Sequence, residues 1–189
     1  MQKKIAHILD GRERQVRKAC AVLQLLPHED FPVVHPFIVL RHLRSAVVRP
    51  GAASGIRYHR RRGFIQVTFQ VAAAVYHKDR SGREAVISAA DDPWMFSGKE
   101  LGDGEGPSPS LRERGGAFEL IQVRLKLPKA HLWTYPENQW AYHDDQPGVL
   151  QQEGVHLRLV CGRYDEAAAL SSGGVPLVAI SGGIEAGKR

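Results

Sequence analysis

Cysteine, methionine and aromatic residues are scarce in this sequence of 189 residues. It contains two cysteines and two methionines, and aromatic residues make up 7%. Cys20 and Cys161 lie far apart, and neither belongs to a Cys-x-x-Cys pair. This spacing argues against a disulfide framework, a structural zinc site or a dithiol redox motif. We expect two ordinary thiols.

Long apolar runs are also missing. No stretch approaches the roughly 20 apolar residues that a membrane-spanning helix needs. The basic start of the chain is followed at once by the charged residues Asp10, Arg12, Glu13 and Arg14 instead of an apolar signal segment. We therefore expect a globular cytoplasmic protein with no membrane partner.

Positive charge is abundant but uneven. The formal net charge is +6, and residues 1–65 hold 13 Lys and Arg against 4 Asp and Glu. Such a patch attracts phosphates, so a basic nucleic-acid-binding module is one alternative function. The basic run at residues 57–62 has no repeated aromatic interleaving and no accompanying nucleic-acid-binding motif. These absences argue against specific nucleic-acid recognition.

Short apolar–polar alternation predicts an all-β fold. Val123, Leu125 and Leu127 alternate with polar residues, which is the period of a strand with one buried face. Comparable segments recur at short spacing between Gly, Pro, Asn or Asp residues, as in sandwiches and jelly-roll barrels. The expected strands cover residues 12–25, 33–43, 63–75, 83–88, 93–97, 118–127, 155–159 and 175–180.

Gly, Pro and Ser residues predict the connections. Residues 77–83 end in Ser81, Gly82 and Arg83 and indicate a hairpin turn, with Gly82 available for positive φ. Residues 98–116 are rich in Gly, Pro and Ser, which predicts a loop. The tail from Ala167 onward indicates a linker and one orphan strand, 175–180. A lone strand can pair with the sheet edge of another copy, so we expect some self-association.

Six segments follow one another along the chain: residues 35–43 (HPFIVLRHL), 59–69 (HRRRGFIQVTF), 77–82 (HKDRSG), 94–105 (WMFSGKELGDGE), 118–123 (FELIQV) and 127–131 (LPKAH). In this order they resemble the pirin family of the cupin superfamily. Residues 59–69 are similar to the family's His-Pro-His-Arg-Gly-Phe-Glu-Thr-Val-Thr-Tyr, and residues 94–105 to its Trp-Met-Thr-Ala-Gly followed by His-Ser-Glu. The six segments fall within roughly residues 30–162.

The resemblance implies a cupin jelly-roll β-barrel with a stub of a second cupin domain. Residues 1–162 would form a pirin-like N-terminal cupin barrel. Residues 163–189 would form a linker and a partial strand of an incomplete second cupin domain.

The resemblance also implies a metal site. Pirins are described as binding one iron through three histidines and a glutamate, and the corresponding positions here are His59, Arg61, Asp103 and Glu105. Only His59 and Glu105 keep the family's residue. Ile65 stands where many pirins have a glutamate after Gly-Phe.

Arg61 is the decisive departure, because a guanidinium is always cationic and has no lone pair for a metal. One alternative is an ion-pair cluster without a metal, in which Arg61 bridges Asp103 and Glu105. The other is a weakly bound divalent metal on His59, Asp103 and Glu105, a set that favours manganese or magnesium over iron. Without the family alignment, His59 would be interpreted as a solvated strand end and the two acids as turn formers.

No other cluster of residues indicates catalysis. A Gly-x-Ser-x-Gly elbow and a phosphate-binding loop are both missing. Six other histidines show no ligand spacing: His28, His35, His42, His131, His143 and His156.

Two main functions follow from the resemblance. The first is a binding or regulatory protein with an altered metal site, acting on an unknown protein or a small aromatic ligand. The alternative is a metal-dependent dioxygenase of the quercetinase type.

Overall fold

The fold is built almost entirely from strands. The computed structural model describes residues 4–17, 20–52, 58–89, 91–170 and 175–188. No helix in these ranges is long and apolar enough to cross a membrane. The strands are β1 Arg12–Arg17, β2 Cys20–Leu26, β3 Phe37–Val48, β4 His59–Arg61, β5 Phe64–Ala72, β6 Val75–Asp79, β7 Glu84–Ile87, β8 Asp92–Phe96, β9 Leu101–Pro107, β10 Gly116–Lys126, β11 Glu137–Ala141, β12 Gly148–Gln152, β13 Val155–Cys161, β14 Arg163–Tyr164, β15 Ala167–Ala168 and β16 Ala179–Ile184. The predicted all-β class is confirmed.

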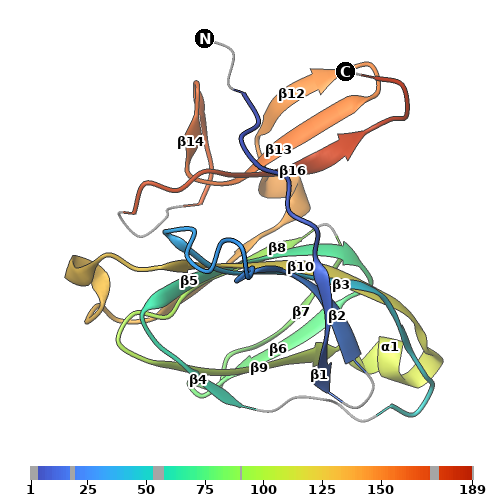
Figure 1. Ribbon diagram of the computed structural model, residues 1–189. Coiled ribbons are helices and arrows are strands. Elements are labelled where there is room, and N and C mark those ends of the chain that lie inside the picture. Colours follow the sequence, from blue (N-terminus) through green and yellow to red (C-terminus); the bar gives the residue numbers. More distant parts are fainter. Residues whose placement is uncertain (1–3, 18–19, 53–57, 90, 171–174, 189) are drawn as a thin grey trace.

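Two antiparallel sheets face each other and form a barrel. One sheet has seven strands in the order β1-β2-β3-β10-β5-β8-β11, and the other has four in the order β4-β9-β6-β7. Figure 1 shows β5, β8 and β10 in the upper layer and β4, β9 and β6 in the lower one. A third sheet, β12-β13-β16, lies above the upper layer.

The two faces of the seven-stranded sheet carry different side chains. On β5, Ile65 and Val67 are buried in an apolar cluster with Val160 and Cys161 of β13, so this face points outward to the third sheet. The intervening residues Gln66, Thr68 and Gln70 point into the barrel, as strand alternation requires. They are buried as well. The barrel interior is therefore polar.

A second apolar cluster closes one end of the barrel. It joins Val75 of β6 to Leu120 of β10 and to Leu111 of the helix α1 Pro109–Arg114. Ser108 caps this helix, since its hydroxyl accepts a hydrogen bond from the Leu111 amide at 3.2 Å. The chain leaves α1 through Gly115, whose φ of 74° suits glycine.

The predicted loop at residues 98–116 is wrong, because this segment contains β9, α1 and the start of β10. In β9, Gly102, Gly104 and Gly106 alternate with residues that carry side chains. A Cβ atom at Gly102 would lie 2.5 Å from the Cδ atom of Arg80. The missing side chain at Gly102 therefore leaves the space that the Arg80 side chain fills.

The hairpin predicted at residues 77–83 is confirmed, since β6 and β7 pair in antiparallel fashion around it. Asp79 fixes the turn by accepting hydrogen bonds from the backbone amides of Ser81 at 2.8 Å and Arg83 at 3.0 Å. Gly82 has the expected positive φ of 88°.

The predicted lone strand at residues 175–180 is wrong in position and in pairing. The strand is β16, Ala179–Ile184, and it pairs with β13. Its partners come from residues 155–161, before the predicted boundary at residue 162. The division into residues 1–162 and 163–189 remains a prediction. The predicted self-association is no longer supported by an unpaired strand, because β16 already pairs with β13.

Candidate functional site

The site lies where β9 pairs with β4 on one side and β6 on the other. His59 of β4 and Asp79 of β6 both face Asp103 in the register, while His77 of β6 faces Glu105. Asp103 and Glu105 are two residues apart on one strand, so their side chains point the same way. Both enter the polar interior.

Arg61 and Asp103 form a buried ion pair. Their side chains are 7% and 0% exposed, and the Arg61 Nε atom donates to Asp103 Oδ1. Arg61 Nη2 also lies 3.9 Å from Glu105 Oε2. Burial raises the pKa of Asp103, and the hydrogen bond from Arg61 offsets only part of this effect. Burial lowers the pKa of Arg61, but the charge of Glu105 and the contact with Asp103 outweigh it, and the net shift is upward. Arg61 therefore stays charged.

Two glutamines connect this pair to the opposite sheet. Gln66 Nε2 donates to Glu105 Oε1 at 3.3 Å, and Gln122 Nε2 donates to Glu105 Oε2 at 3.0 Å. The Gln66 side-chain oxygen accepts from two guanidinium groups, Arg61 Nη1 at 2.9 Å and Arg124 Nε at 2.8 Å. Each glutamine thus points its amide nitrogen at a carboxylate and its oxygen at a cation.

Arg124 adds a further positive charge to the network. Its pKa is lowered to about 10, first by burial and then by the charges of Arg61 and Arg41. Arg41 in turn donates from Nε to the Gln122 side-chain oxygen at 2.9 Å. The network thus holds three arginines, Arg61, Arg124 and Arg41, against the two carboxylates Asp103 and Glu105, one positive charge in excess.

His77 is the residue that the sequence analysis missed. It is 3% exposed, and one donor atom from each of His77, Asp103 and Glu105 lies within 4.8 Å of the other two. His77 Nε2 and Asp103 Oδ2 are buried and have no hydrogen-bond partner among the described residues. The histidine appeared only as part of a hairpin motif, and its pairing with Glu105 depends on β9 being a strand.

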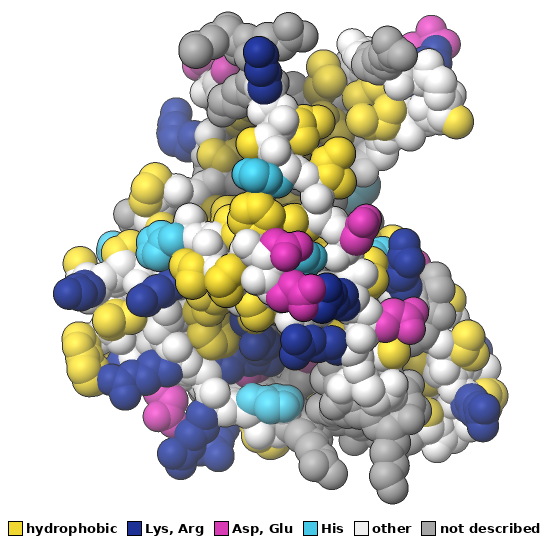
Figure 2. Space-filling view, viewed as in Figure 1, with side chains coloured by type: hydrophobic (Ala, Val, Ile, Leu, Met, Phe, Trp, Pro, Cys, Tyr) yellow, Lys and Arg dark blue, Asp and Glu magenta, His cyan; other side chains and the backbone are white. Residues whose placement is uncertain are grey.

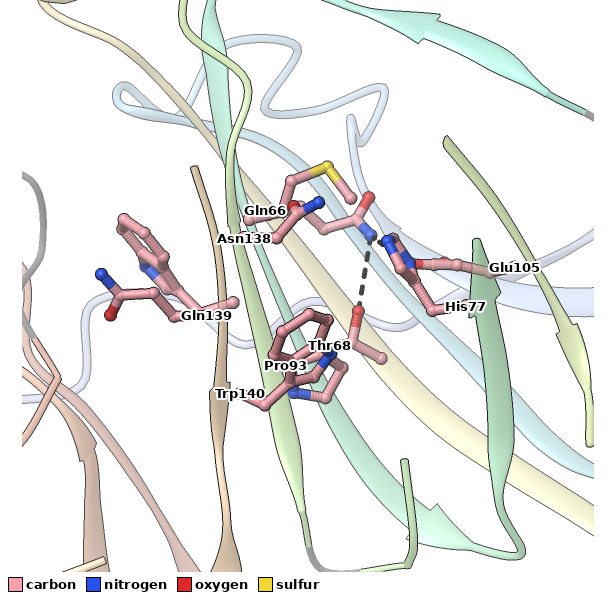
Figure 3. A pocket seen from close by; sticks show the side chains of 10 residues that line it. Gln66, Thr68, His77, Pro93, Glu105, Asn138, Gln139 and Trp140 are labelled. Carbon is pink, nitrogen blue, oxygen red and sulfur yellow. Dashed lines mark hydrogen bonds and ion pairs between the residues drawn. The ribbon is translucent and has the colours of Figure 1, made fainter. Parts of the chain in front are cut away.

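A small cavity adjoins this group. Figure 3 shows His77 and Glu105 side by side, with Gln66 reaching toward them and a dashed line from Gln66 to Thr68. The cavity volume is about 10 Å³, room for roughly one water molecule. Its walls are Gln66, Thr68, His77, Pro93, Trp94, Met95, Glu105, Asn138, Gln139 and Trp140. An aromatic ligand would need a site of several hundred Å³.

The four positions carried over from the family do not come together as one donor set. His59 has an exposed side chain at the strand end and is not in the group that Asp103 and Glu105 form with His77. The Arg61 guanidinium contacts Asp103 directly and adds a positive charge. These residues do not fit the four-ligand iron site of the family. One nitrogen and two oxygen donors, two of them lacking hydrogen bonds, do fit a small divalent cation on His77, Asp103 and Glu105.

Comparisons with known proteins agree with this fold. A model of the pirin family matches residues 14–123, more than half of the chain. A Pseudomonas aeruginosa protein provisionally named quercetin 2,3-dioxygenase is 29% identical over 158 residues, which cover 82% of this chain and 55% of the relative. Arabidopsis thaliana Pirin-1 is 25% identical over 133 residues, covering 70% of this chain and 42% of the relative. The chain thus spans about half the length of these curated relatives.

Solved structures extend the agreement. A quercetin 2,3-dioxygenase from Acinetobacter baumannii superposes with a TM-score of 0.80 at 27% identity, covering 92% of this chain and 62% of the other. An Escherichia coli pirin in complex with nickel(II) superposes with a TM-score of 0.57 at 16% identity, over 79% of this chain and 67% of the other, and shows the fold alone. The predicted cupin fold is confirmed, and the chain belongs to the pirin family.

Proposed function

We propose that this chain is a pirin-like cupin with an altered metal site that acts as a binding or regulatory protein with little or no catalysis. A single observation carries the proposal. The guanidinium of Arg61 is buried at a position where the family has a metal ligand. It pairs with Asp103, which stands at another of the family's ligand positions.

This replacement affects the chemistry directly. A bound iron with open positions would supply dioxygen activation in a quercetinase. Arg61 cannot ligate iron, and its charge is permanent. Its ion pair also ties up one oxygen of Asp103, while Gln66 and Gln122 hold both oxygens of Glu105. In the proposed function, these residues fix the two sheets against each other.

Binding would use the outside of the barrel. Trp133 and Tyr135 are 72% and 80% exposed. The Arg62 guanidinium lies 4.4 Å from the Trp133 ring centroid, and the Lys99 ammonium lies 3.8 Å from that of Tyr135. Exposed aromatic residues beside cations are enriched where proteins bind partners. This surface supports a partner protein or a small aromatic ligand met in the cytoplasm.

Figure 2 shows that most Lys and Arg side chains on the visible face lie over the barrel. Positive charge on this face is therefore carried mainly by the barrel. Any affinity for phosphates that follows from it should fall steeply with salt.

Oxygen consumption tests the proposal. The purified chain is loaded with ferrous iron under anaerobic conditions, mixed with quercetin and then exposed to oxygen in an oxygen electrode. We expect no quercetin-dependent consumption. The matched variant carries Arg61→His and Asp103→His, which restores the three histidines and the glutamate of the family, and it should bind iron.

Turnover by the unmodified chain would overturn the proposal if it were lost on Glu105→Gln. Failure of the Arg61→His and Asp103→His double variant to bind any iron would overturn the role given to Arg61.

A further inference from the structure

We propose that His77, Asp103 and Glu105 bind one divalent cation of the manganese class, with Asp103 shared between that cation and Arg61. The nitrogen ligand is then His77 of β6, and His59 of β4 has no part in the site. The inference rests on the proposed function in one respect: Arg61 stays paired with Asp103.

The three donors are placed for a shared ligand. Their atoms come from adjacent strands, β6 and β9, and lie within 4.8 Å of one another. His77 Nε2 and Asp103 Oδ2 are buried without a hydrogen-bond partner among the described residues. Buried polar atoms are nearly always satisfied, so these two atoms call for a partner such as an ion or a water between the strands.

The ion pair with Arg61 leaves this space open. Arg61 Nε binds the Oδ1 atom of Asp103, whereas the orphaned atom is Oδ2. On Glu105, Oε2 faces Arg61 at 3.9 Å, whereas Oε1 faces His77 Nδ1 at 3.9 Å. Glu105 thus has one oxygen toward Arg61 and the other toward His77, and Asp103 keeps one oxygen that Arg61 does not bind. A ligating carboxylate that is also hydrogen-bonded is the usual arrangement around metals.

Charge and donor type set the kind of ion. Asp103 and Glu105 carry two negative charges, while Arg61, Arg124 and Arg41 bring three positive charges into the same network, so a bound cation meets no excess of negative charge. Binding should therefore be weak. Two carboxylates and one imidazole suit manganese better than a soft ion such as copper(I). The adjoining cavity of about 10 Å³ leaves room for roughly one water ligand.

Manganese titration tests the site. Free Mn²⁺ is measured by its six-line EPR spectrum while the full chain is titrated, with circular dichroism recorded for every variant. We expect one Mn²⁺ per chain. His77→Gln should lower the affinity tenfold or more, by roughly the amount seen even for supporting residues of metal sites. Arg61→Gln should raise the affinity, because it removes a competing cation from Asp103.

His59→Gln is the matched control. This histidine is in the adjacent strand and was a candidate ligand from the sequence, but it is outside the donor group. Its substitution should change the manganese affinity by no more than about twofold, because only the loss of a residue that ligates the metal weakens a site strongly.

A wild-type chain that binds no manganese would overturn the proposal, as would affinity that depends on His59 and not on His77. Should His77→Gln fail to fold, pulsed EPR of the wild-type complex decides. Coupling to one histidine nitrogen supports the site, and its absence overturns it. None of these readouts involves iron or oxygen, so they are independent of the quercetin assay.

Discussion

The two faces of the seven-stranded sheet show how one strand can serve two purposes. On β5, Ile65 and Val67 face outward into an apolar cluster beneath β13, while Gln66 and Thr68 face inward toward Glu105. The outer face is stabilised by apolar burial, which is roughly proportional to area and tolerant of detail. The inner face depends on specific partners, because a buried polar group that loses its partner is costly.

The inner face accommodates the buried guanidinium of Arg61 because Asp103 and Gln66 accept its hydrogen bonds. Changes on the inner face must therefore come as matched sets, whereas the outer face tolerates changes of similar volume singly.

We expect the largest loss of stability when one charge is removed from the inner face. Arg61→Leu leaves Asp103 buried without its cation, and we expect the free energy of unfolding to fall by about 4 kcal/mol at pH 8. Urea denaturation followed by circular dichroism measures it. Adding Asp103→Leu should recover part of the loss, since both charges are then gone. A cost below about 1 kcal/mol for Arg61→Leu would show that the ion pair does not form.

The outer face should respond to a cavity instead. Ile65 is 1% exposed, so Ile65→Ala should lower the free energy of unfolding by about 3 kcal/mol. Manganese affinity should be unchanged, because the side chain points away from His77 and Glu105. Parallel urea and EPR titrations check both statements. A loss of manganese binding at full folding would show that the two faces are coupled.

The buried carboxyl group of Asp92 makes the stability of the protein depend on pH. Burial raises its pKa to about 7, partly offset by hydrogen bonds from the Gln70 amide and Gln146 Nε2. The folded pKa lies above the unfolded value, so the folded state holds the proton between about pH 4 and 7. Stability should fall as pH rises through this window, by roughly 2–3 kcal/mol from pH 5 to pH 8.

Asp92→Asn removes this titration. Urea denaturation across the same pH range should give a flatter profile for the variant than for the parent. Identical profiles would mean that Asp92 is not buried in its acid form.

The smallest effect is expected at the cap of α1. Ser108→Ala removes the hydroxyl that accepts from the Leu111 amide and should cost about 1 kcal/mol. Ser110→Ala is the control, because it is exposed and lies within the helix. A cost at Ser110 equal to that at Ser108 would contradict a specific cap.

Period-2 patterns made much of the fold predictable. The alternation in residues 118–127 and 155–159 corresponds to β10 and β13, and the hairpin motif to β6 and β7. The strand β9 was not predicted, because the composition around Gly102, Gly104 and Gly106 indicates a loop. At Gly102 the tertiary contact with Arg80 explains the glycine, because a Cβ atom there would clash with the Arg80 side chain.

The candidate site was predictable only in part. Family resemblance placed Asp103 and Glu105, and the chemistry of a guanidinium raised the ion pair of Arg61 with carboxylates. His77 could not be found in this way, because its proximity to Glu105 arises from strand pairing between distant segments. The shift of β16 away from residues 175–180 has the same origin, since pairing with β13 sets its register.

The most direct test of the account is a crystal structure of the chain soaked in Mn²⁺, with anomalous scattering measured at the manganese edge. We expect one anomalous peak bounded by His77, Asp103 and Glu105, with the Arg61 guanidinium still on Asp103. A peak ligated by His59, with Arg61 turned out to solvent, would contradict the account.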